Sequence, residues 1–267
     1  MRGIHAAMLV STALVLIWIV NAEVYSAQAR SKPSENERAD TGPYPWQGHL
    51  RAMAGSVNKI YCGASLIAPK WALTAARCID TAKGIIHIVT FGKIVSQTPL
   101  VGSEQRTATH LRHEQFDETN MLNDIALLTW TKEITPSDHI QPIALPRPFE
   151  DNEATFIGET VSISGFGRAE SNSLYVADQS LCATSYINFA PNTNLCAKAK
   201  VIDQSTFCLG DTGGPLVYLN ATSNTRVQIG IASHGVMMCS PDPSVYTRVT
   251  AYLPWIEANS GYDKNQF

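Results

Sequence analysis

Short apolar runs separated by glycine, proline and asparagine follow one another along most of this chain. Rich in β-branched or aromatic residues, these runs are residues 61–68, 71–74, 85–91, 125–130, 160–166 and 227–233. In one of them, Val161 and Ile163 alternate with Ser162 and Ser164, the period-two pattern of a strand with one buried face. Many short strands joined by turns predict an all-β barrel or sandwich.

Length, composition and charge narrow the class further. The chain has 267 residues, enough for one large all-β domain or two small ones, and 45% of them are hydrophobic. A formal net charge of −3 gives no reason to expect nucleic acid or a membrane as partner. No Cys-x-x-Cys or His-x-x-x-His pair suggests a metal site, and we expect neither metal nor cofactor.

One amphipathic helix is predicted over residues 252–259, beginning near Pro254.

The N-terminal residues have the pattern of a secretory signal peptide. Arg2 precedes an apolar run over residues 6–20, which is shorter than the roughly 20 residues of a membrane-spanning helix. Small residues allow cleavage after Ala22 or after Ala29, and the sequence does not choose between them. We therefore expect a secreted, extracellular protein with four segments: a signal peptide (1–29), a polar leader (30–42), a folded domain (43–260) and a short tail (261–267).

Cysteines and one sequon agree with an extracellular location. Six cysteines, an even number, suggest disulfide bonds in a secreted chain, although the sequence alone does not choose the pairing. Asn220 begins the sequon Asn-Ala-Thr, which predicts glycosylation on an exposed loop, with a chance match as the alternative.

In the segment that ends at Leu216, a threonine hydroxyl lies close in sequence to three glycines. It reads Phe207-Cys208-Leu209-Gly210-Asp211-Thr212-Gly213-Gly214-Pro215-Leu216. Glycines adopt backbone conformations that other residues avoid, so two backbone N–H groups can converge on one point. The segment resembles the active-site loop of trypsin-like serine proteases, in which Gly-Asp-Ser-Gly-Gly-Pro carries the nucleophile. Thr212 stands where that family has serine.

Further motifs occur in the order in which that family has them. Residues 73–78 read Leu-Thr-Ala-Ala-Arg-Cys and resemble Leu-Thr-Ala-Ala-His-Cys, whose histidine is the general base. Residues 124–127 read Asp-Ile-Ala-Leu, the motif of the orienting acid, and residues 62–67 and 245–249 match as well. On these motifs the chain is identified as a member of the chymotrypsin-fold serine proteases, and it resembles their non-catalytic secreted homologues, which are common in arthropods.

The resemblance implies a fold, a set of disulfides and a substrate pocket. The fold would be two antiparallel β-barrels with a C-terminal helix. The disulfides would be Cys62–Cys78, Cys182–Cys196 and Cys208–Cys239. The amides of Gly210 and Thr212 would form the oxyanion hole. The specificity pocket would have Thr206 at its floor and Gly235 and Ser244 on its walls, without an acidic residue to favour Lys or Arg side chains.

Two departures from the family concern activation and the second barrel. Family members are activated by cleavage between a basic residue and Ile/Val-Val-Gly-Gly, and no such sequence occurs near residues 32–33. Asp211 would therefore have no apolar N-terminus to pair with. Residues 166–182 are also fewer than the family usually has, and residues 174–176 are the candidate remnant of a strand there. A shortened rim and a gene-model error remain alternatives.

The residues at the triad positions predict an inactive site. A catalytic triad needs a hydroxyl, a base that accepts its proton near neutral pH, and a carboxylate that orients the base. Thr212 supplies a hydroxyl with a crowding methyl group, and threonine nucleophiles exist. Arg77, at the position of the base, stays protonated and cannot accept a proton. Asp124 is at the position of the acid, so Arg77, Asp124 and Thr212 form a triad-equivalent set without a base.

Histidines elsewhere in the sequence offer no replacement. His234 is nearest, in Ser-His-Gly where the family has Ser-Trp-Gly, and it is expected to line the cleft without facing the nucleophile. His87, His110 and His113 fall in segments expected elsewhere in the first barrel.

A buried Asp124 without its histidine needs another partner. An isolated buried carboxylate is costly, and the guanidinium of Arg77 has donors to offer. We therefore expect an Arg77–Asp124 ion pair that fills the former active site. The alternative is that Arg77 turns to solvent while backbone or water satisfies Asp124.

The expected function is protein binding by a monomeric, secreted, catalytically inactive serine protease homologue. Its partners would be other secreted proteins, such as proteases, protease inhibitors or components of an extracellular proteolytic cascade such as innate immunity. One alternative is an active endopeptidase that uses Thr212 with a non-standard base. Another is a salivary, venom or reproductive-fluid protein with a binding role of its own.

Overall fold

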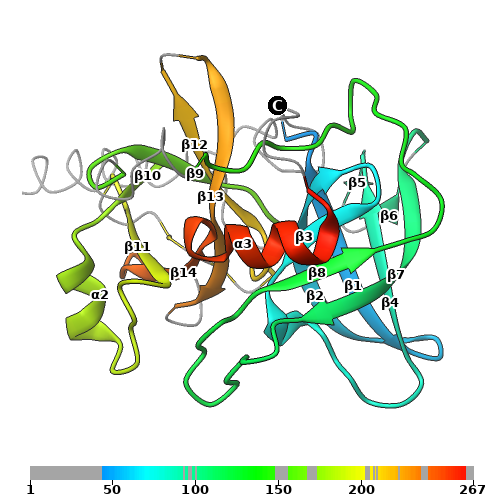
Figure 1. Ribbon diagram of the computed structural model, residues 1–267, viewed down its shortest axis with the longest axis horizontal. Helices are drawn as coiled ribbons and strands as arrows, with labels where there is room; N and C mark the ends of the chain where they lie inside the picture. Colours follow the sequence, from blue (N-terminus) through cyan, green and yellow to red (C-terminus); the bar gives the residue numbers. More distant parts are fainter. Residues whose placement is uncertain are drawn as a thin grey trace, which may run out of the picture. The chain divides into compact units, whose positions relative to one another are not determined.

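The strands of this chain close into two separate barrels (Figure 1). The computed structural model describes residues 44–92, 94–95, 98–99, 101–147, 156–166, 173–201, 205–206, 208, 210–221, 223–235 and 240–262. The expected signal peptide, the expected leader and most of the expected tail lie outside this range. No helix within the described residues is long and apolar enough to cross a membrane.

Six antiparallel strands form the first barrel, in the order β1-β2-β3-β8-β7-β4. Their bounds are β1 (Gln47–Ala54), β2 (Val57–Ala68), β3 (Trp71–Thr74), β4 (Ile85–Phe91), β7 (Glu104–Arg112) and β8 (Ala126–Thr129). A 3₁₀ helix, η1 (Ala76–Cys78), follows β3, and β5 (Ile94–Val95) pairs with β6 (Thr98–Pro99) as a separate ribbon. The apolar runs predicted β3, β4 and β8 to within a few residues and the second part of β2, but they did not predict β1 or β7.

The second barrel is also antiparallel and closed, in the order β10-β11-β14-β13-β12-β9. Its strands are β9 (Thr160–Ile163), β10 (Ser173–Val176), β11 (Asn194–Ala199), β12 (Pro215–Asn220), β13 (Thr225–His234) and β14 (Ser244–Arg248). A short helix, α2 (Gln179–Ser185), connects β10 to β11. The candidate remnant at residues 174–176 is a complete strand, β10, because it pairs with β9 on one side and β11 on the other.

Helix α3 (Val249–Ser260) leaves the second barrel and packs against the first, beside β3 and β8 in Figure 1. Val249, Tyr252, Leu253 and Ile256 are buried in the core cluster of the first barrel. The predicted start near Pro254 is wrong, because this proline lies inside the helix. Burial of the apolar residues on both sides of Pro254 outweighs the one backbone hydrogen bond that proline cannot donate.

Two disulfide bonds are formed among the described residues. Cys62 on β2 is bonded to Cys78 of η1, and Cys182 on α2 is bonded to Cys196 on β11. The first closes a loop with a sequence separation of 16, which in the chain-entropy model stabilises the fold by about 3 kcal/mol. Cys208 is also disulfide-bonded, and its expected partner, Cys239, lies outside the described residues.

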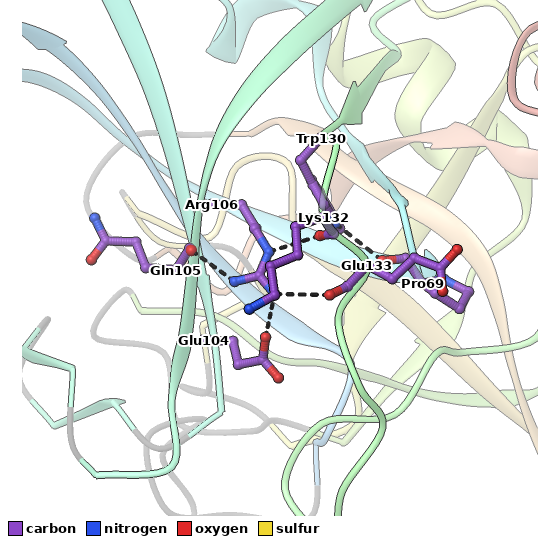
Figure 2. Close-up of polar contacts among 7 residues, drawn as sticks. All are labelled: Pro69, Glu104, Gln105, Arg106, Trp130, Lys132 and Glu133. Carbon is purple, nitrogen blue, oxygen red and sulfur yellow. Dashed lines mark hydrogen bonds and ion pairs between the residues drawn. The ribbon is translucent and has the colours of Figure 1, made fainter.

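Polar contacts secure β7 to the segment that follows β8, at the end of the first barrel away from η1 (Figure 2). The guanidinium of Arg106 donates to the carbonyl oxygens of Lys132 and Glu133, each at 3.0 Å. Nearby, Nε1 of Trp130 donates to the carbonyl oxygen of Pro69 at 3.0 Å. Side-chain donors thereby satisfy backbone carbonyl oxygens that lie outside the strands.

The two barrels meet where β2 faces the turn before β12. The N–H of Gly63 donates to the carbonyl of Thr212 at 2.7 Å. Gly213 has φ +81°, and a Cβ there would lie 2.4 Å from Oγ1 of Thr74 and 2.5 Å from the carbonyl oxygen of Gly63. Two backbones approach this closely only because neither residue has a side chain.

We expect Gly213→Ala to be strongly destabilising. The new methyl would overlap two fixed atoms and force an L-residue into a left-handed conformation, a combined cost of about 3 kcal/mol. Gly55→Ala is the matched control, since Gly55 also has positive φ (+60°) but nothing within 4 Å of the added carbon. Urea unfolding measures both changes, and equal losses would show that the contact between the barrels contributes nothing.

His49 on β1 is buried near this junction between two aromatic rings. It is 1% exposed, and its ring centroid lies 5.8 Å from that of Tyr61 and 4.7 Å from that of Phe166. Its Nε2 atom has no hydrogen-bond partner among the described residues. Burial, with a smaller contribution from the charge of Arg51, lowers the pKa of His49 from 6.5 to about 4.

The lowered pKa predicts acid sensitivity. Above pH 6.5, His49 is neutral in the folded and unfolded states and costs nothing. As the pH falls from 6.5 to 4, the unfolded state takes up the proton first, and this residue alone removes about 3 kcal/mol of the unfolding free energy. Urea unfolding at pH 7 and pH 4.5 should show a smaller loss for His49→Phe than for the natural protein. Parallel losses would contradict the assignment.

Candidate active site

The three triad-equivalent positions come together between the barrels. Arg77 lies in η1 after β3, Asp124 lies two residues before the first residue of β8, and Thr212 lies in the turn before β12. The backbone N–H of Arg77 donates to Oδ1 of Asp124 at 2.9 Å, and Arg77 and Thr212 line one cavity. The sequence motifs therefore converge on one site.

Asp124 is 1% exposed and is held from both barrels. Besides the N–H of Arg77, the hydroxyl of Ser233 on β13 donates to Oδ2 at 2.6 Å. The hydroxyl of Thr247 on β14 donates to the carbonyl oxygen of Asp124 at 2.8 Å. Burial raises the pKa of the Asp124 carboxyl, and the hydrogen bond from Ser233 is the largest of the opposing influences.

The expected ion pair between Arg77 and Asp124 is wrong. In the described part of the chain, no nitrogen of the guanidinium lies within ion-pair distance of the carboxylate. Nη1 of Arg77 donates instead to the carbonyl oxygen of Ser233 at 3.1 Å, and the side chain is exposed. The carboxylate is already satisfied by short hydrogen bonds from the backbone and from a short side chain, which lose little conformational freedom, so a long cation is not required.

Asn123 presents Asp124 to the site through its backbone conformation. Its φ is +54°, a left-handed value that asparagine adopts more readily than most residues. Its side chain is fixed at both ends, with Nδ2 donating to the carbonyl of Gln115 at 2.8 Å and Oδ1 accepting from the hydroxyl of Tyr252 at 2.8 Å. Tyr252 belongs to α3, so this helix helps to position the loop.

In the turn that carries Thr212, some backbone N–H groups donate hydrogen bonds to described residues and others do not. Those of Asp211, Gly213 and Gly214 donate to the carbonyls of Cys208, Ala232 and Asp211, respectively. Those of Gly210 and Thr212, the expected oxyanion-hole donors, donate to no described residue. Gly210 has φ +103°, a conformation that turns successive N–H groups to the same side of the chain.

The Thr212 side chain has a hydroxyl but no adjacent base. The residue is 9% exposed, and within the described range its hydroxyl forms no hydrogen bond. Nearby, Asp211 is 1% exposed, and its Oδ2 accepts the N–H of Cys208 at 2.9 Å. Among the described residues, no proton acceptor is hydrogen-bonded to the hydroxyl of Thr212.

His234 contacts other groups than Thr212. Its Nδ1 lies 3.0 Å from the Ser233 hydroxyl, and its ring packs edge-on against Tyr186. Burial, then the positive charge of Arg77, lowers the pKa of His234 from 6.5 to about 4. It is therefore neutral near pH 7 but a weak proton acceptor.

The other histidines singled out in the sequence also lie elsewhere. His87 and His110 pack against each other across β4 and β7, with centroids 4.7 Å apart. His113 packs against Tyr252 and Trp255 of α3.

The floor of the expected specificity pocket is uncharged, and its side chains hydrogen-bond to one another and to nearby backbone. Thr206 is 1% exposed, and its hydroxyl contacts that of Ser244 and donates to the carbonyl of Asp242. The hydroxyl of Tyr246 donates to the carbonyl of Thr206 at 2.9 Å. Thr206 and Ser244 thus come together as expected, and Gly235 is half-buried on the segment after β13.

An open cavity lies beside the triad-equivalent positions, and the sequence motifs marked only part of its walls. Its volume is about 450 Å³, and it is lined by Lys59, Ile60, Tyr61, Cys62, Arg77, Phe166, Gly210 and Thr212. The sequence also did not reveal the role of Ser233, because its hydrogen bond to Asp124 joins positions more than a hundred residues apart. No group of metal-ligating side chains occurs within the described residues.

Asn220, the predicted glycosylation site, ends β12 at the hairpin to β13. Its Oδ1 accepts the N–H of Ser223 at 3.2 Å. Thr222 of the sequon lies outside the described residues, and modification stays a prediction.

Removal of the Ser233 hydroxyl should weaken the site and the fold together. Ser233→Ala takes away a hydrogen bond to a buried carboxylate, which we expect to lower the unfolding free energy by about 2 kcal/mol. Ser223→Ala, at an exposed position of the β12–β13 hairpin, is the control and should change stability little. Chemical denaturation measures both; similar values would mean that Ser233 does not support Asp124.

Comparison with known proteins agrees with this geometry. Residues 34–256 match the family model described as Trypsin. The chain is 29% identical to "Serine protease grass" of Drosophila melanogaster over 79% of its length, and it spans 63% of that relative. It is 30% identical to "Phenoloxidase-activating factor 3" of Holotrichia diomphalia, with 84% of this chain and 71% of the relative covered.

A solved structure shares the fold. "Structure of GrC" superposes with a TM-score of 0.70 at 23% identity, covering 82% of this chain and 95% of that one. With two closed six-stranded barrels, converging triad-equivalent positions and a family match over most of its length, this chain belongs to the trypsin-like serine protease family.

Proposed function

We propose that this protein is a secreted, catalytically inactive member of the family that acts by binding other proteins in an extracellular proteolytic cascade. The observation that carries the proposal is Arg77 at the position of the general base. A guanidinium cannot take the proton of a nucleophile near neutral pH, because its pKa is above about 12 in proteins. Loss of the base histidine costs another serine protease on the order of a million-fold in turnover.

The contacts of the neighbouring groups support inactivity. Thr212 has a hydroxyl without a hydrogen-bonded acceptor among the described residues. His234, the nearest histidine in sequence, has a pKa of about 4 and contacts Ser233. The sequence also lacks the basic residue followed by Ile/Val-Val-Gly-Gly that would supply an activating N-terminus.

The binding role rests on the scaffold and on the relatives. Disulfides and two closed barrels give a rigid support for surface loops, which is a common basis for recognition. The two insect relatives are named as a serine protease and a phenoloxidase-activating factor, so cascade components such as proteases or their inhibitors are the proposed partners. Secretion follows from the signal-peptide pattern of the first residues.

The competing function is an active endopeptidase that uses Thr212. A fluorophosphonate probe and a mixture of peptide substrates should leave the natural protein unlabelled and the peptides intact. Stoichiometric labelling of Thr212, or hydrolysis at an enzymatic rate, would overturn the proposal.

A gain-of-function variant tests whether Arg77 and Thr212 are the cause of the proposed inactivity. We expect Arg77→His combined with Thr212→Ser to hydrolyse peptides once residues 32–36 are replaced by a cleavable basic residue followed by Ile-Val-Gly-Gly. Each single substitution should give much less activity, because members of a triad act as a unit. A properly folded but silent double variant would show that Arg77 and Thr212 are not what disarms the site.

A further inference from the structure

The cavity beside Arg77 brings together positive charge and residues whose backbone N–H groups donate to no other described residue. We infer that it is a receptor for a carboxylate group, carried by the C-terminus or by an acidic side chain of a bound polypeptide. This inference rests on the proposed protein-binding function and specifies the chemistry that the cleft would recognise.

Two cations contribute to the cavity without a carboxylate partner. Within the described residues, neither Arg77 nor Lys59 is in an ion pair. Arg77 uses Nη1 for the Ser233 carbonyl, while Nε and Nη2 donate to no described residue. The guanidinium is therefore anchored at one corner and offers its other donors, in the planar geometry that matches a carboxylate.

Two residues of the turn before β12 line the same cavity. These are Gly210 and Thr212, and their N–H groups are the two in this turn that donate to no described residue. In an active protease such amides stabilise an oxyanion that exists only during the reaction. Placed beside a permanent cation, they are complementary to an anion that is present at rest.

The walls favour a carboxylate attached to an apolar group. Ile60, Tyr61 and Phe166 line the cavity, and His49 packs behind the two aromatic rings. With a pKa of about 4, His49 is neutral near pH 7 and adds no third cation. Two cations, apolar walls and a volume of about 450 Å³ suit one carboxylate with a neighbouring side chain better than a polysulfated chain.

Fluorescence anisotropy with matched peptides tests the inference. The probe is Gly-Ala-Leu-Phe with a free C-terminal carboxylate and an uncharged methoxycoumarin label on its N-terminus, compared with the same labelled peptide as a C-terminal amide. A third peptide, Gly-Asp-Leu-Phe amide with the same label, has only a side-chain carboxylate. We expect at least one carboxylate peptide to bind about tenfold more tightly than the uncharged amide, as for one charge-assisted hydrogen-bonded contact.

Variants identify the cavity as the binding site. Arg77→Gln should abolish the preference for the carboxylate, and Lys59→Gln should weaken it. Lys132→Gln is the matched control, because it removes one positive charge from the segment after β8, beyond the end of β3 that is away from η1, and should bind like the natural protein. Circular dichroism checks that each variant is folded. Because Lys59 is exposed, we expect Lys59→Gln to fold, so this variant still tests the site if Arg77→Gln does not fold.

The outcomes separate the inference from the proposed function. Equal affinity for acid and amide, a preference that survives both substitutions, or stronger displacement by a sulfated heparin tetrasaccharide than by the acid peptide would overturn the carboxylate site. Binding of only the first peptide would identify a chain terminus as the source, and binding of the third would identify a side chain. Mass spectrometry of the same samples reports hydrolysis, which would contradict the inactive function whatever the affinities are.

Discussion

The burial of the Asp124 carboxylate between the two barrels is the constraint on which this site depends. Two of its hydrogen bonds come from different barrels, one from the backbone of Arg77 and one from the hydroxyl of Ser233. A third bond, from Thr247, holds its carbonyl oxygen. A buried carboxylate is costly unless it is satisfied, so the barrels have to be docked before the site is stable. Docking in turn brings β2 against the turn that carries Thr212.

This arrangement explains how the base position can change while the fold remains. Residue 77 holds Asp124 through its backbone N–H, and that interaction is independent of the side chain. The side chain therefore decides the chemistry of the cleft and not the integrity of the barrel junction. The arginine side chain donates to the carbonyl oxygen of Ser233 and leaves the carboxylate network in place, and under the proposed function it stands where a proton acceptor would be needed.

The sequence predicted the elements better than the contacts. Apolar runs and turn residues located β2, β3, β4, β8, β9 and β13, whereas β1, β7, β11, β12 and β14 were not predicted. Local motifs located Arg77, Asp124 and Thr212, because each motif lies within a few consecutive residues. The Arg77–Asp124 ion pair was wrong because charge complementarity in sequence does not reveal that Ser233 and backbone groups already satisfy the carboxylate. The helix start was misplaced for a similar reason, since the apolar contacts that carry α3 past Pro254 are tertiary.

The cavity could not be predicted because its walls come from segments that meet only in the folded chain. Lys59 and Tyr61 come from β2, Arg77 from η1 and Gly210 from the turn before β12. Arg77 and Gly210 lie in recognisable motifs, whereas Lys59 and Tyr61 have an ordinary sequence context. Their combination matters because electrostatic interactions strengthen where water is partly excluded. Under the proposed function, Arg77 has two consequences at once: the cleft lacks a base at this position, and it has a positive charge beside residues whose amides have no partner among the described residues.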